Sequence, residues 1–372
     1  MVENLRLGIV GCGRVAEARH LPALRATRGA EVVALSDPDA ARLERAAALA
    51  PRARRFADYR EMLRAADLDA VAVCTPPRLH AEVALAALDA GKHLFVEKPL
   101  ALTVDECDEM ARRARASGRV AVVGFNMRWH AHVREARRRV ARGELGRVKL
   151  ARTVLTSGVR FGREFPAWRA RREEGGGAVF ELGVHHFDLL RYVLGSEARE
   201  VFADWTEDET ATVAARMSDG AQVLAAFCEG TVESHELEIF GERGRVRVSC
   251  YRADGFESFG AGDYDGSPRV RLRGLARATR ALPRMLAAAR TGGEYVATYA
   301  AEWRHFVAAV RGEARPEPTL EDGRRALEIA LAARESSRLR RAVSLTEELF
   351  DDGGRDGRGG AQFEVSNLKS EV

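Results

Sequence analysis

Short apolar runs alternate with amphipathic stretches along the first third of the chain. The runs have the length of buried parallel strands, and the longer stretches repeat their apolar positions at the spacing of a helix. The predicted strands are 5–10, 31–35, 70–74, 94–96 and 120–125. The predicted helices are 15–25, 58–66, 80–90 and 103–117. Strands that alternate with helices in this way predict a doubly wound parallel sheet.

The pattern changes at about residue 130, where an arginine-rich helix is predicted over 133–141. The alternating apolar and polar residues that follow are typical of strands with one buried face. These strands are 148–156, 200–206, 210–217, 222–229, 236–240 and 245–249, and further helices are predicted over 281–291, 299–311 and 320–340. Turns such as Asp219-Gly220 favour hairpins. We therefore predict an α/β fold in which the parallel sheet is followed by an α+β domain with a large, mostly antiparallel open sheet.

The length of the chain, 372 residues, favours two hydrophobic cores. We place the first domain at 1–126 and the second at 127–346, where the antiparallel pattern and the last helices lie. Residues 347–372 are rich in glycine and charge, and we expect a flexible tail there.

Composition argues against several classes of protein. Hydrophobic residues make up 46% of the chain and charged residues 31%, and the net charge is only +4. The basic residues form no block interleaved with aromatic residues, which argues against nucleic acid, and no apolar run is long enough to span a membrane. The five cysteines contain no C-x-x-C pair, and the amino terminus enters a strand at once. We therefore expect a cytoplasmic protein with free thiols.

A glycine-rich turn, Gly11-x-Gly13-x-x-Ala16, follows the first predicted strand and opens a helix. This context matches the fingerprint of a Rossmann dinucleotide-binding domain. Gly11 permits the tight turn, and Gly13 lets the backbone approach a pyrophosphate. Arg14 and Val15 begin the helix, whose amino terminus favours the anion. A turn of this kind can also simply join a strand to a helix.

Asp37 ends the second predicted strand. A carboxylate at this position can accept hydrogen bonds from both ribose hydroxyls of NAD and would repel the 2′-phosphate of NADP. The alternative is that Asp37 caps a helix whose first residue is Pro38. Together with the glycine turn, Asp37 favours NAD over NADP as the cofactor.

Polar residues follow the other predicted strands of the first domain. The carboxyl ends of parallel strands meet at one edge of a sheet, where a dinucleotide binds. The residues at these ends, or at the helix start that follows, are Thr75, Pro76, His80, Glu97, Lys98 and Asn126. We predict that they contact the cofactor. For His80, a helix-capping or packing role is an equal alternative.

Lys98 stands out because the chain has only four lysines among its 59 basic residues. An ammonium group can lose its proton near neutral pH when it is desolvated, whereas a guanidinium group cannot. Lys98 at the end of a buried strand is therefore a candidate for chemistry, and a salt bridge or a surface cation is the competing explanation.

Glu181 and His185 form a second candidate centre. Their spacing of four places both on one face of a helix, where the carboxylate can fix the tautomer of the imidazole. His186 points in a different direction, so the two histidines should not share a role. We predict no metal site here, because two adjacent histidines without a third clustered ligand do not match a zinc site.

These motifs together resemble those of the Gfo/Idh/MocA family of nicotinamide-dependent oxidoreductases. The resemblance rests on the glycine turn, Asp37, Thr75-Pro76-Pro77, Gly91-Lys92-His93, Glu97-Lys98-Pro99 and Gly175-Gly176-Gly177 followed by Glu181-x-Gly183-x-His185-x-x-Asp188. It covers residues 5–345 and implies a Rossmann domain, followed by a substrate-binding and oligomerisation domain. The family usually has aspartate where this chain has Glu181.

The resemblance also implies a small carbohydrate, sugar acid or cyclitol as substrate, and a homodimer or homotetramer formed through the open sheet. It places Lys98 and His185 at the reacting carbon. We expect His185 to remove the proton of a secondary hydroxyl while Lys98 stabilises the oxygen. Glu181 would orient His185, and Glu97 would hold Lys98. The opposite assignment, with Lys98 as the base, remains open. The predicted substrate-binding residues are Lys98, Arg128, Trp168, Arg169, Glu181 and His185.

Two other functions remain open. The chain could retain its cofactor through non-redox chemistry, as NAD-dependent glycosidases related to this family do, or it could be a non-catalytic NAD-binding regulator. Arg160, Arg163 and Arg169 suggest an acidic or phosphorylated ligand, and a salt-bridged loop explains them equally well.

Overall fold

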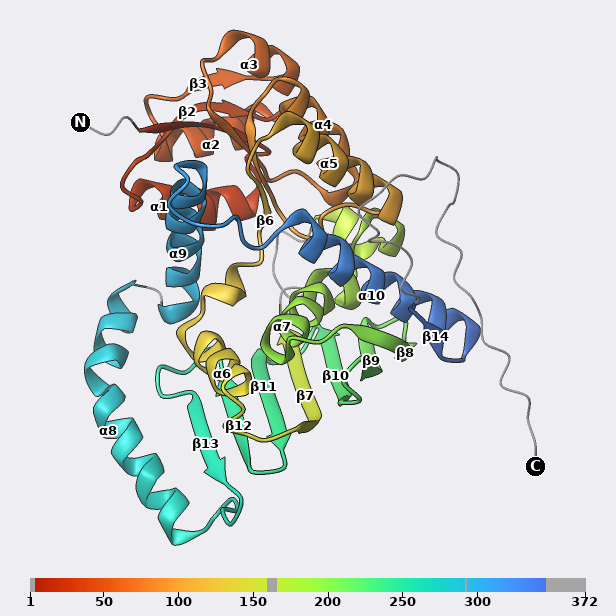
Figure 1. The fold of residues 1–372 in the computed structure, drawn as a ribbon. Helices are drawn as coiled ribbons and strands as arrows, with labels where there is room; N and C mark the ends of the chain where they lie inside the picture. Colours follow the sequence, from red (N-terminus) through yellow and green to blue (C-terminus); the bar gives the residue numbers. More distant parts are fainter. Residues whose placement is uncertain (1–3, 159–165, 292, 346–372) are drawn as a thin grey trace.

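The computed structural model describes residues 4–158, 166–291 and 293–345. Two sheets organise the chain, one in each half of the sequence, and helices pack between and around them (Figure 1). The predicted ligand contacts at Arg160 and Arg163 and the predicted tail at 347–372 lie outside the described residues.

The first sheet has six parallel strands in the order β3-β2-β1-β4-β5-β6. The strands are β1 (Leu5–Val10), β2 (Ala30–Ser36), β3 (Arg54–Phe56), β4 (Ala70–Val73), β5 (His93–Val96) and β6 (Ala121–Val123). The helices between them are α1 (Leu21–Arg25), α2 (Ala40–Leu49), α3 (Tyr59–Ala65), α4 (His80–Asp89) and α5 (Val104–Ser117). The predicted doubly wound arrangement is confirmed. The chain order reverses between β1 and β4, which is where such sheets bind dinucleotides.

Some local features of this domain differ from the prediction. The sequence pattern did not indicate β3, because only Phe56 of its three residues is buried and so short an edge strand shows no period. The helix after the glycine turn begins as a π-helix, η1 (Ala16–His20), before α1. The helix after β2 begins at Ala40, and Asp39 caps it by accepting from two backbone N–H groups. Asp37 therefore does not cap this helix.

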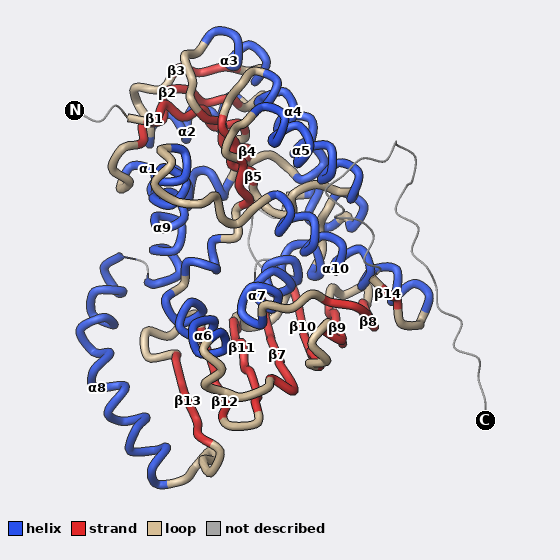
Figure 2. The backbone as a smooth tube through the Cα atoms, in the orientation of Figure 1, coloured by secondary structure: helices blue, strands red, loops and turns tan. Residues whose placement is uncertain are grey.

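The second sheet has eight strands in the order β13-β12-β11-β7-β10-β9-β8-β14. Its strands are β7 (Val148–Ser157), β8 (Ala198–Trp205), β9 (Thr210–Met217), β10 (Gln222–Glu229), β11 (Ser234–Gly241), β12 (Gly244–Ser249), β13 (Phe256–Gly260) and β14 (Val343–Ser344). Only the β7–β10 pair is parallel, so the predicted, mostly antiparallel sheet is confirmed. The helices α6 (Ala131–Ala141), α7 (Val184–Leu194) and α10 (Leu320–Leu339) lie over one face (Figure 2).

The opposite face of this sheet carries a row of side chains that runs across the strands. Phe202, Ala214 and Leu224 are cross-strand neighbours on β8, β9 and β10, and Arg152 and Glu238 continue the row on β7 and β11. Phe202 is 49% exposed and Leu224 is 54% exposed, whereas Arg152 and Glu238 form an ion pair of 2.5 Å. This face is therefore apolar at one end and charged at the other.

The helices α8 (Pro268–Thr291) and α9 (Gly293–Val310) follow the last hairpin, and α9 returns to the first sheet (Figure 1). Trp303 of α9 is fully buried and stacks on Phe95 of β5, with ring centroids 4.4 Å apart. Together with α1 and α2, α9 covers one face of the first sheet, and α3, α4 and α5 cover the other. The first core thus contains residues from the far end of the sequence.

The longest of the described helices, α8, begins well before the predicted residue 281. Leu272, Leu275 and Leu286 are each more than half exposed on its surface, and the helix contains no acidic residue. Its arginines interrupt the apolar positions. Within the described ranges, no helix combines the length and the apolar character that crossing a membrane requires.

Candidate active site

The glycine turn after β1 leaves room for a ligand. Gly11 has a φ of 91°, and a Cβ atom there would lie 2.6 Å from the backbone of Cys74. A Cβ atom on Gly13 would meet no heavy atom within 4 Å, so the space beside the turn is open. Arg14 is exposed at the start of the helical stretch and Val15 is half-buried. The turn therefore fits the close approach of a pyrophosphate to the backbone.

Asp37 lies directly beside this turn and is 5% exposed. Its Oδ2 accepts a 2.8 Å hydrogen bond from the backbone N–H of Cys12, and Oδ1 accepts from the N–H of Asp39 at 2.9 Å. The carboxylate thus fixes the turn that would hold the pyrophosphate. A negative charge is buried at the position where the second strand of this fold meets the ribose.

The loop after β4 is held in place by His80, which is 1% exposed. The ring nitrogens Nδ1 and Nε2 lie 2.8 Å from the backbone oxygens of Pro99 and Thr75, respectively. Burial lowers the pKa of His80, although both carbonyls oppose that shift. Because both nitrogens face backbone oxygens, we assign His80 to the packing role, which was the alternative, and not to the predicted cofactor contact. Pro76 precedes the short helix that leads to His80.

Glu97 does not hold the Lys98 ammonium, contrary to the prediction. Its Oε1 lies 2.7 Å from Nε2 of His20, and Oε2 accepts from the backbone N–H of Lys98 at 3.1 Å. His20 in turn accepts a 3.1 Å hydrogen bond from the indole of Trp303. Burial raises the pKa of Glu97, but the His20 hydrogen bond and nearby charges outweigh burial, and the net pKa is lowered. His20 could not be assigned from the sequence, because its partners lie far away along the chain.

The Lys98 side chain reaches the second domain. Its ammonium lies 3.1 Å from the backbone oxygen and 3.3 Å from Oε2 of Glu181, and the side chain is 13% exposed. The bond between Lys98 and Pro99 is cis. The structure thus brings together two predicted site residues that are far apart in the sequence.

Glu181 is a buried carboxylate between two cations. Besides Lys98, its Oε2 accepts a 2.8 Å hydrogen bond from Nη2 of Arg169, which also lies 3.6 Å from Glu229. Burial raises the pKa of Glu181, but Arg169 and Lys98 lower it by more, so the net pKa is below its ordinary value. The other oxygen, Oε1, is buried without a hydrogen-bond partner among the described residues. It is therefore available to a hydroxyl group of a ligand. Glu229 carried no signal in the sequence beyond its place in a strand.

His185 does not pair with Glu181, so the predicted orienting role is wrong. The segment Val179–Gly183 (η7) is a π-helix that leads into α7. A π-turn changes which residues share a face, and this removes the i, i+4 alignment that the prediction assumed. Nδ1 of His185 is buried without a hydrogen-bond partner in the described structure. Burial, the charge of Lys98 and His186 together place the pKa of His185 well below its ordinary value.

Arg128 is a structural residue and not the predicted substrate contact. Its guanidinium makes two hydrogen bonds to Asp188, at 2.8 and 2.5 Å, and an ion pair of 2.8 Å to Asp322. The side chain is 5% exposed, and Asp188 is fully buried. Buried carboxylates require a cation close by, and Arg128 supplies it together with Arg191, which lies 3.9 Å from Asp188.

Three other predicted contact residues are positioned by hydrogen bonds within the protein. The amide of Asn126 donates a 2.8 Å hydrogen bond to Thr298 of α9, so only its place after β6 supports the predicted cofactor contact. Trp168 and Arg169 lie in the short helix η5 (Ala167–Ala170). The backbone oxygen of Arg169 accepts from Gly177, which anchors this loop against the triple glycine.

Comparisons with known proteins agree with this fold. Residues 5–125 match the family model of the GFO/IDH/MocA oxidoreductases with an NAD-binding Rossmann fold. Residues 133–247 match the GFO/IDH/MocA C-terminal domain. The chain is 27% identical over 356 residues to a myo-inositol 2-dehydrogenase of Thermotoga maritima, which covers 92% of this chain and 99% of the relative. It is 36% identical over 202 residues to a D-glucoside 3-dehydrogenase of Escherichia coli, covering 52% and 55%.

Solved structures show the same fold. The WlbA dehydrogenase from Bordetella pertussis, in complex with NADH and UDP-GlcNAcA, superposes with a TM-score of 0.78 at 23% identity, covering 93% of this chain and 99% of that one. A myo-inositol 2-dehydrogenase from Lactobacillus plantarum gives a TM-score of 0.74 at 24% identity, covering 92% and 100%. The two family models together match more than half of the residues. The chain therefore belongs to the GFO/IDH/MocA family of oxidoreductases.

Proposed function

We propose that this protein is an NAD-dependent dehydrogenase that moves a hydride between nicotinamide and a secondary hydroxyl or ketone of a sugar, a sugar acid or a cyclitol. The observation that carries the proposal is the combination of Lys98, whose ammonium is held by Glu181, with a nearby His185 that burial keeps neutral. A neutral imidazole accepts a proton, and an ammonium group donates hydrogen bonds. The oxidation of an alcohol needs both.

The roles of these residues follow from their chemistry. A bound nicotinamide cofactor would supply the acceptor for the hydride that leaves the carbinol carbon. His185 takes the proton of the hydroxyl group, and Nζ of Lys98 donates a hydrogen bond to the same oxygen as it becomes a carbonyl oxygen. In the reverse direction His185 returns the proton. The ion pair with Glu181 suits Lys98 to the donor role and leaves His185 as the base.

The fit of a dinucleotide is supported by open space and by unsatisfied polar atoms. Besides the free space at Gly13, the buried polar atoms that lack hydrogen-bond partners within the described residues include Oγ1 of Thr75, Oε1 of Glu181 and Nδ1 of His185. Such atoms are costly unless a ligand or water satisfies them. Asp37, Thr75 and the glycine turn would hold the cofactor, and the buried charge of Asp37 favours NAD over NADP.

A polyhydroxylated substrate suits the second half of the site. Glu181 offers an acceptor, Lys98 and Arg169 offer donors, and Trp168 offers a flat apolar surface of the kind that packs on sugar rings. The names of the inositol and glucoside dehydrogenases among the relatives support the same substrate class.

The open face of the second sheet supports a homo-oligomer. Phe202 and Leu224 are exposed in one cross-strand row, and the pairing of a second copy on this face would bury them. Light scattering after size exclusion tests this, because Leu224→Arg should convert a dimer or tetramer to smaller species. An unchanged mass would rule out this face as the subunit contact.

A substrate screen tests the activity. Sugars, uronates and inositols are offered with NAD and NADP in parallel, and NADH or NADPH formation is followed by absorbance. We expect turnover with a member of one of these classes and a higher kcat/KM with NAD.

The matched comparison is Lys98→Met against Lys149→Met, because Lys149 is an exposed lysine that pairs with Glu242 away from the site. Loss of turnover in both variants would contradict the assignment.

A further inference from the structure

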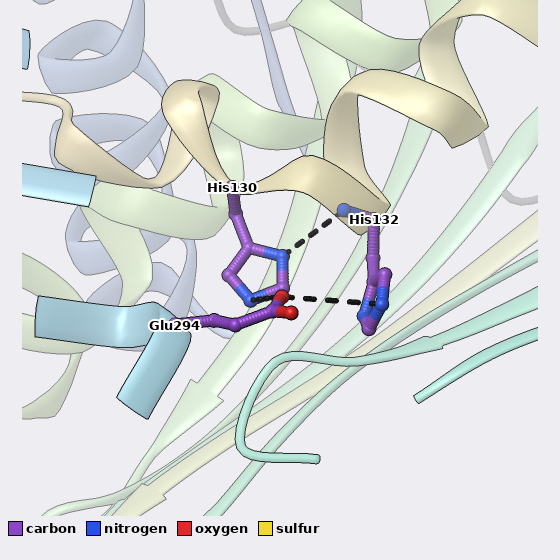
Figure 3. Close-up of side chains that lie close together, drawn as sticks. All are labelled: His130, His132 and Glu294. Atoms are coloured by element: carbon purple, nitrogen blue, oxygen red, sulfur yellow. Dashed lines mark hydrogen bonds and ion pairs between the residues drawn. The ribbon is translucent and has the colours of Figure 1, made fainter. Parts of the chain in front are cut away.

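Two histidines and a glutamate from distant parts of the chain meet beside the junction of α6 and α9 (Figure 3). His130 precedes α6, His132 lies in its first turn, and Glu294 lies in the first turn of α9. One ligand atom from each residue lies within 4.8 Å of the other two. Within the described ranges, no other group of three such residues is as close.

The carboxylate of Glu294 lies close to both histidine rings. Oε2 of Glu294 lies 3.7 Å from Nε2 of His130 and 4.0 Å from Nε2 of His132. The side chain of His130 is fully buried, that of His132 is 9% exposed and that of Glu294 is 26% exposed. Oε2 of Glu294 itself is buried and receives no hydrogen bond in the described structure. A buried carboxylate oxygen between two imidazole rings, without a donor, is costly unless a cation satisfies it.

We propose that His130, His132 and Glu294 bind one Zn²⁺ ion. Imidazole nitrogen and carboxylate oxygen are ligands that zinc prefers, at about 2.0–2.2 Å. Ligand atoms at these distances from a tetrahedral ion lie about 3.3–3.5 Å from one another. The observed separations of 3.7 and 4.0 Å therefore need only small side-chain movements to close around an ion.

Water would complete the tetrahedral shell of the ion, and a backbone oxygen borders the cluster. The backbone oxygen of Cys250 lies 3.1 Å from Nε2 of His130, on the strand side of the site. Nδ1 of His130 accepts the backbone N–H of His132 at 3.2 Å, so the ring carries its proton on Nε2. Binding of Zn²⁺ to Nε2 would move this proton to Nδ1, where it would face the backbone N–H of His132, so the backbone at the start of α6 would have to shift to separate the two donors.

The ion would have a structural role. It would join the start of α6 to the start of α9, and α9 carries the residues that dock on the first sheet. Neither His130 nor Glu294 belongs to the proposed catalytic group, so this site stands apart from the proposed dehydrogenase activity. The sequence predicted no metal site, because two of its ligands are separated from the third by most of the second domain.

Metal binding by the full chain, without a histidine tag, tests the proposal. The protein is stripped with a chelator, and Zn²⁺ is titrated in competition with a chromophoric chelator while thermal unfolding is followed in parallel. We expect one equivalent per chain and a Tm that rises with Zn²⁺ and returns after chelation. Co²⁺ should give the absorption bands of a tetrahedral site.

Matched variants locate the site. Glu294→Gln and His132→Gln should each weaken Zn²⁺ binding at least about tenfold and remove the rise in Tm. Glu313→Gln, which changes an exposed glutamate after the same helix, should bind like the parent. Circular dichroism of the metal-free variants shows that they are folded, and the two ligand variants serve as independent checks. Absence of stoichiometric binding by the parent, or parent-like binding by both ligand variants, would overturn the proposal.

Discussion

The ammonium group of Lys98 lies 3.1 Å from the backbone oxygen of Glu181 and 3.3 Å from its carboxylate. Lys98 follows a strand of the first sheet, and Glu181 lies in the π-turn before α7. The contact therefore joins the Rossmann domain to the second domain at the point where we propose that the reaction takes place. A substitution of either residue should change turnover more than it changes cofactor affinity.

Lys98→Met should reduce kcat by about 10²–10³-fold, because the variant loses the donor to the developing carbonyl oxygen. NAD affinity should stay within about twofold, since the glycine turn and Asp37 are untouched. The value of kcat, measured from NADH absorbance, checks the first part of this prediction. The NAD affinity, measured by titration calorimetry, checks the second part. A parallel loss of NAD affinity would move Lys98 from the reacting oxygen to the cofactor.

Glu181→Gln should lower kcat more than Glu181→Asp. The amide removes the charge that pairs with Lys98 and Arg169, whereas aspartate keeps the charge and is the residue usual in the family. Steady-state kinetics of the two variants, each folded by circular dichroism, measures the difference. Equal losses would show that the reach of the side chain matters and its charge does not.

Protonation of His185 should cause little loss of kcat/KM until the pH is well below 6.5. Its pKa lies well below the ordinary value because of burial, the charge of Lys98 and the neighbouring His186. The base therefore stays neutral and active through the physiological range. An NMR titration of the His185 ring in Lys98→Met should show a higher pKa than in the parent, because one positive charge is removed. A lower value in the variant would contradict this electrostatic account.

Arg128→Ala should reduce the free energy of unfolding by about 3–5 kcal/mol, because it removes both hydrogen bonds to the buried Asp188 and leaves only Arg191, at 3.9 Å, as a nearby cation. Arg138→Ala is the matched control, since Arg138 is 61% exposed and pairs only one turn away with Glu135. The control should change stability by less than about 0.5 kcal/mol. Chemical denaturation with a common m-value measures both. A small effect of Arg128→Ala would return Arg128 to the list of possible ligand contacts.

Acid should destabilise the fold through His186. Burial lowers the pKa of His186 from 6.5 to about 3. Between these two values the unfolded chain binds more protons than the folded chain, so stability falls as the pH drops from 6.5 towards 3. The slope from this one group is at most about 1.4 kcal/mol per pH unit. His186→Gln, followed by denaturation at several pH values, should flatten that slope, and an unchanged slope would assign the acid sensitivity to other groups.

Much of the architecture could be predicted from the chain alone. The strands of the first sheet are short apolar runs buried on both faces, and turn residues mark their ends. The hairpins of the second sheet alternate with period two, which is why β9 and β10 match their predicted bounds. Local pattern was sufficient there, because burial repeats with the geometry of the strand.

The site itself depends on contacts that no local pattern shows. The pairing of Glu181 with Lys98 and Arg169, in place of His185, follows from the π-turn. The pairing of Glu97 with His20 depends on two segments that meet only in the folded sheet. Residue types indicated which side chains carry chemistry, and the tertiary fold determined which partners they meet.

Because Trp303 of α9 stacks on Phe95, the core of the amino-terminal sheet needs α9 as well as the six strands of the sheet. A chain leaving the ribosome has all six strand segments long before α9 emerges, and until then the face around Phe95 lacks the part of its cover that α9 supplies. The fragment 1–126 should therefore aggregate when it is expressed alone. Supplying residues 293–345 in trans, or fusing them to its end, should restore a soluble sheet.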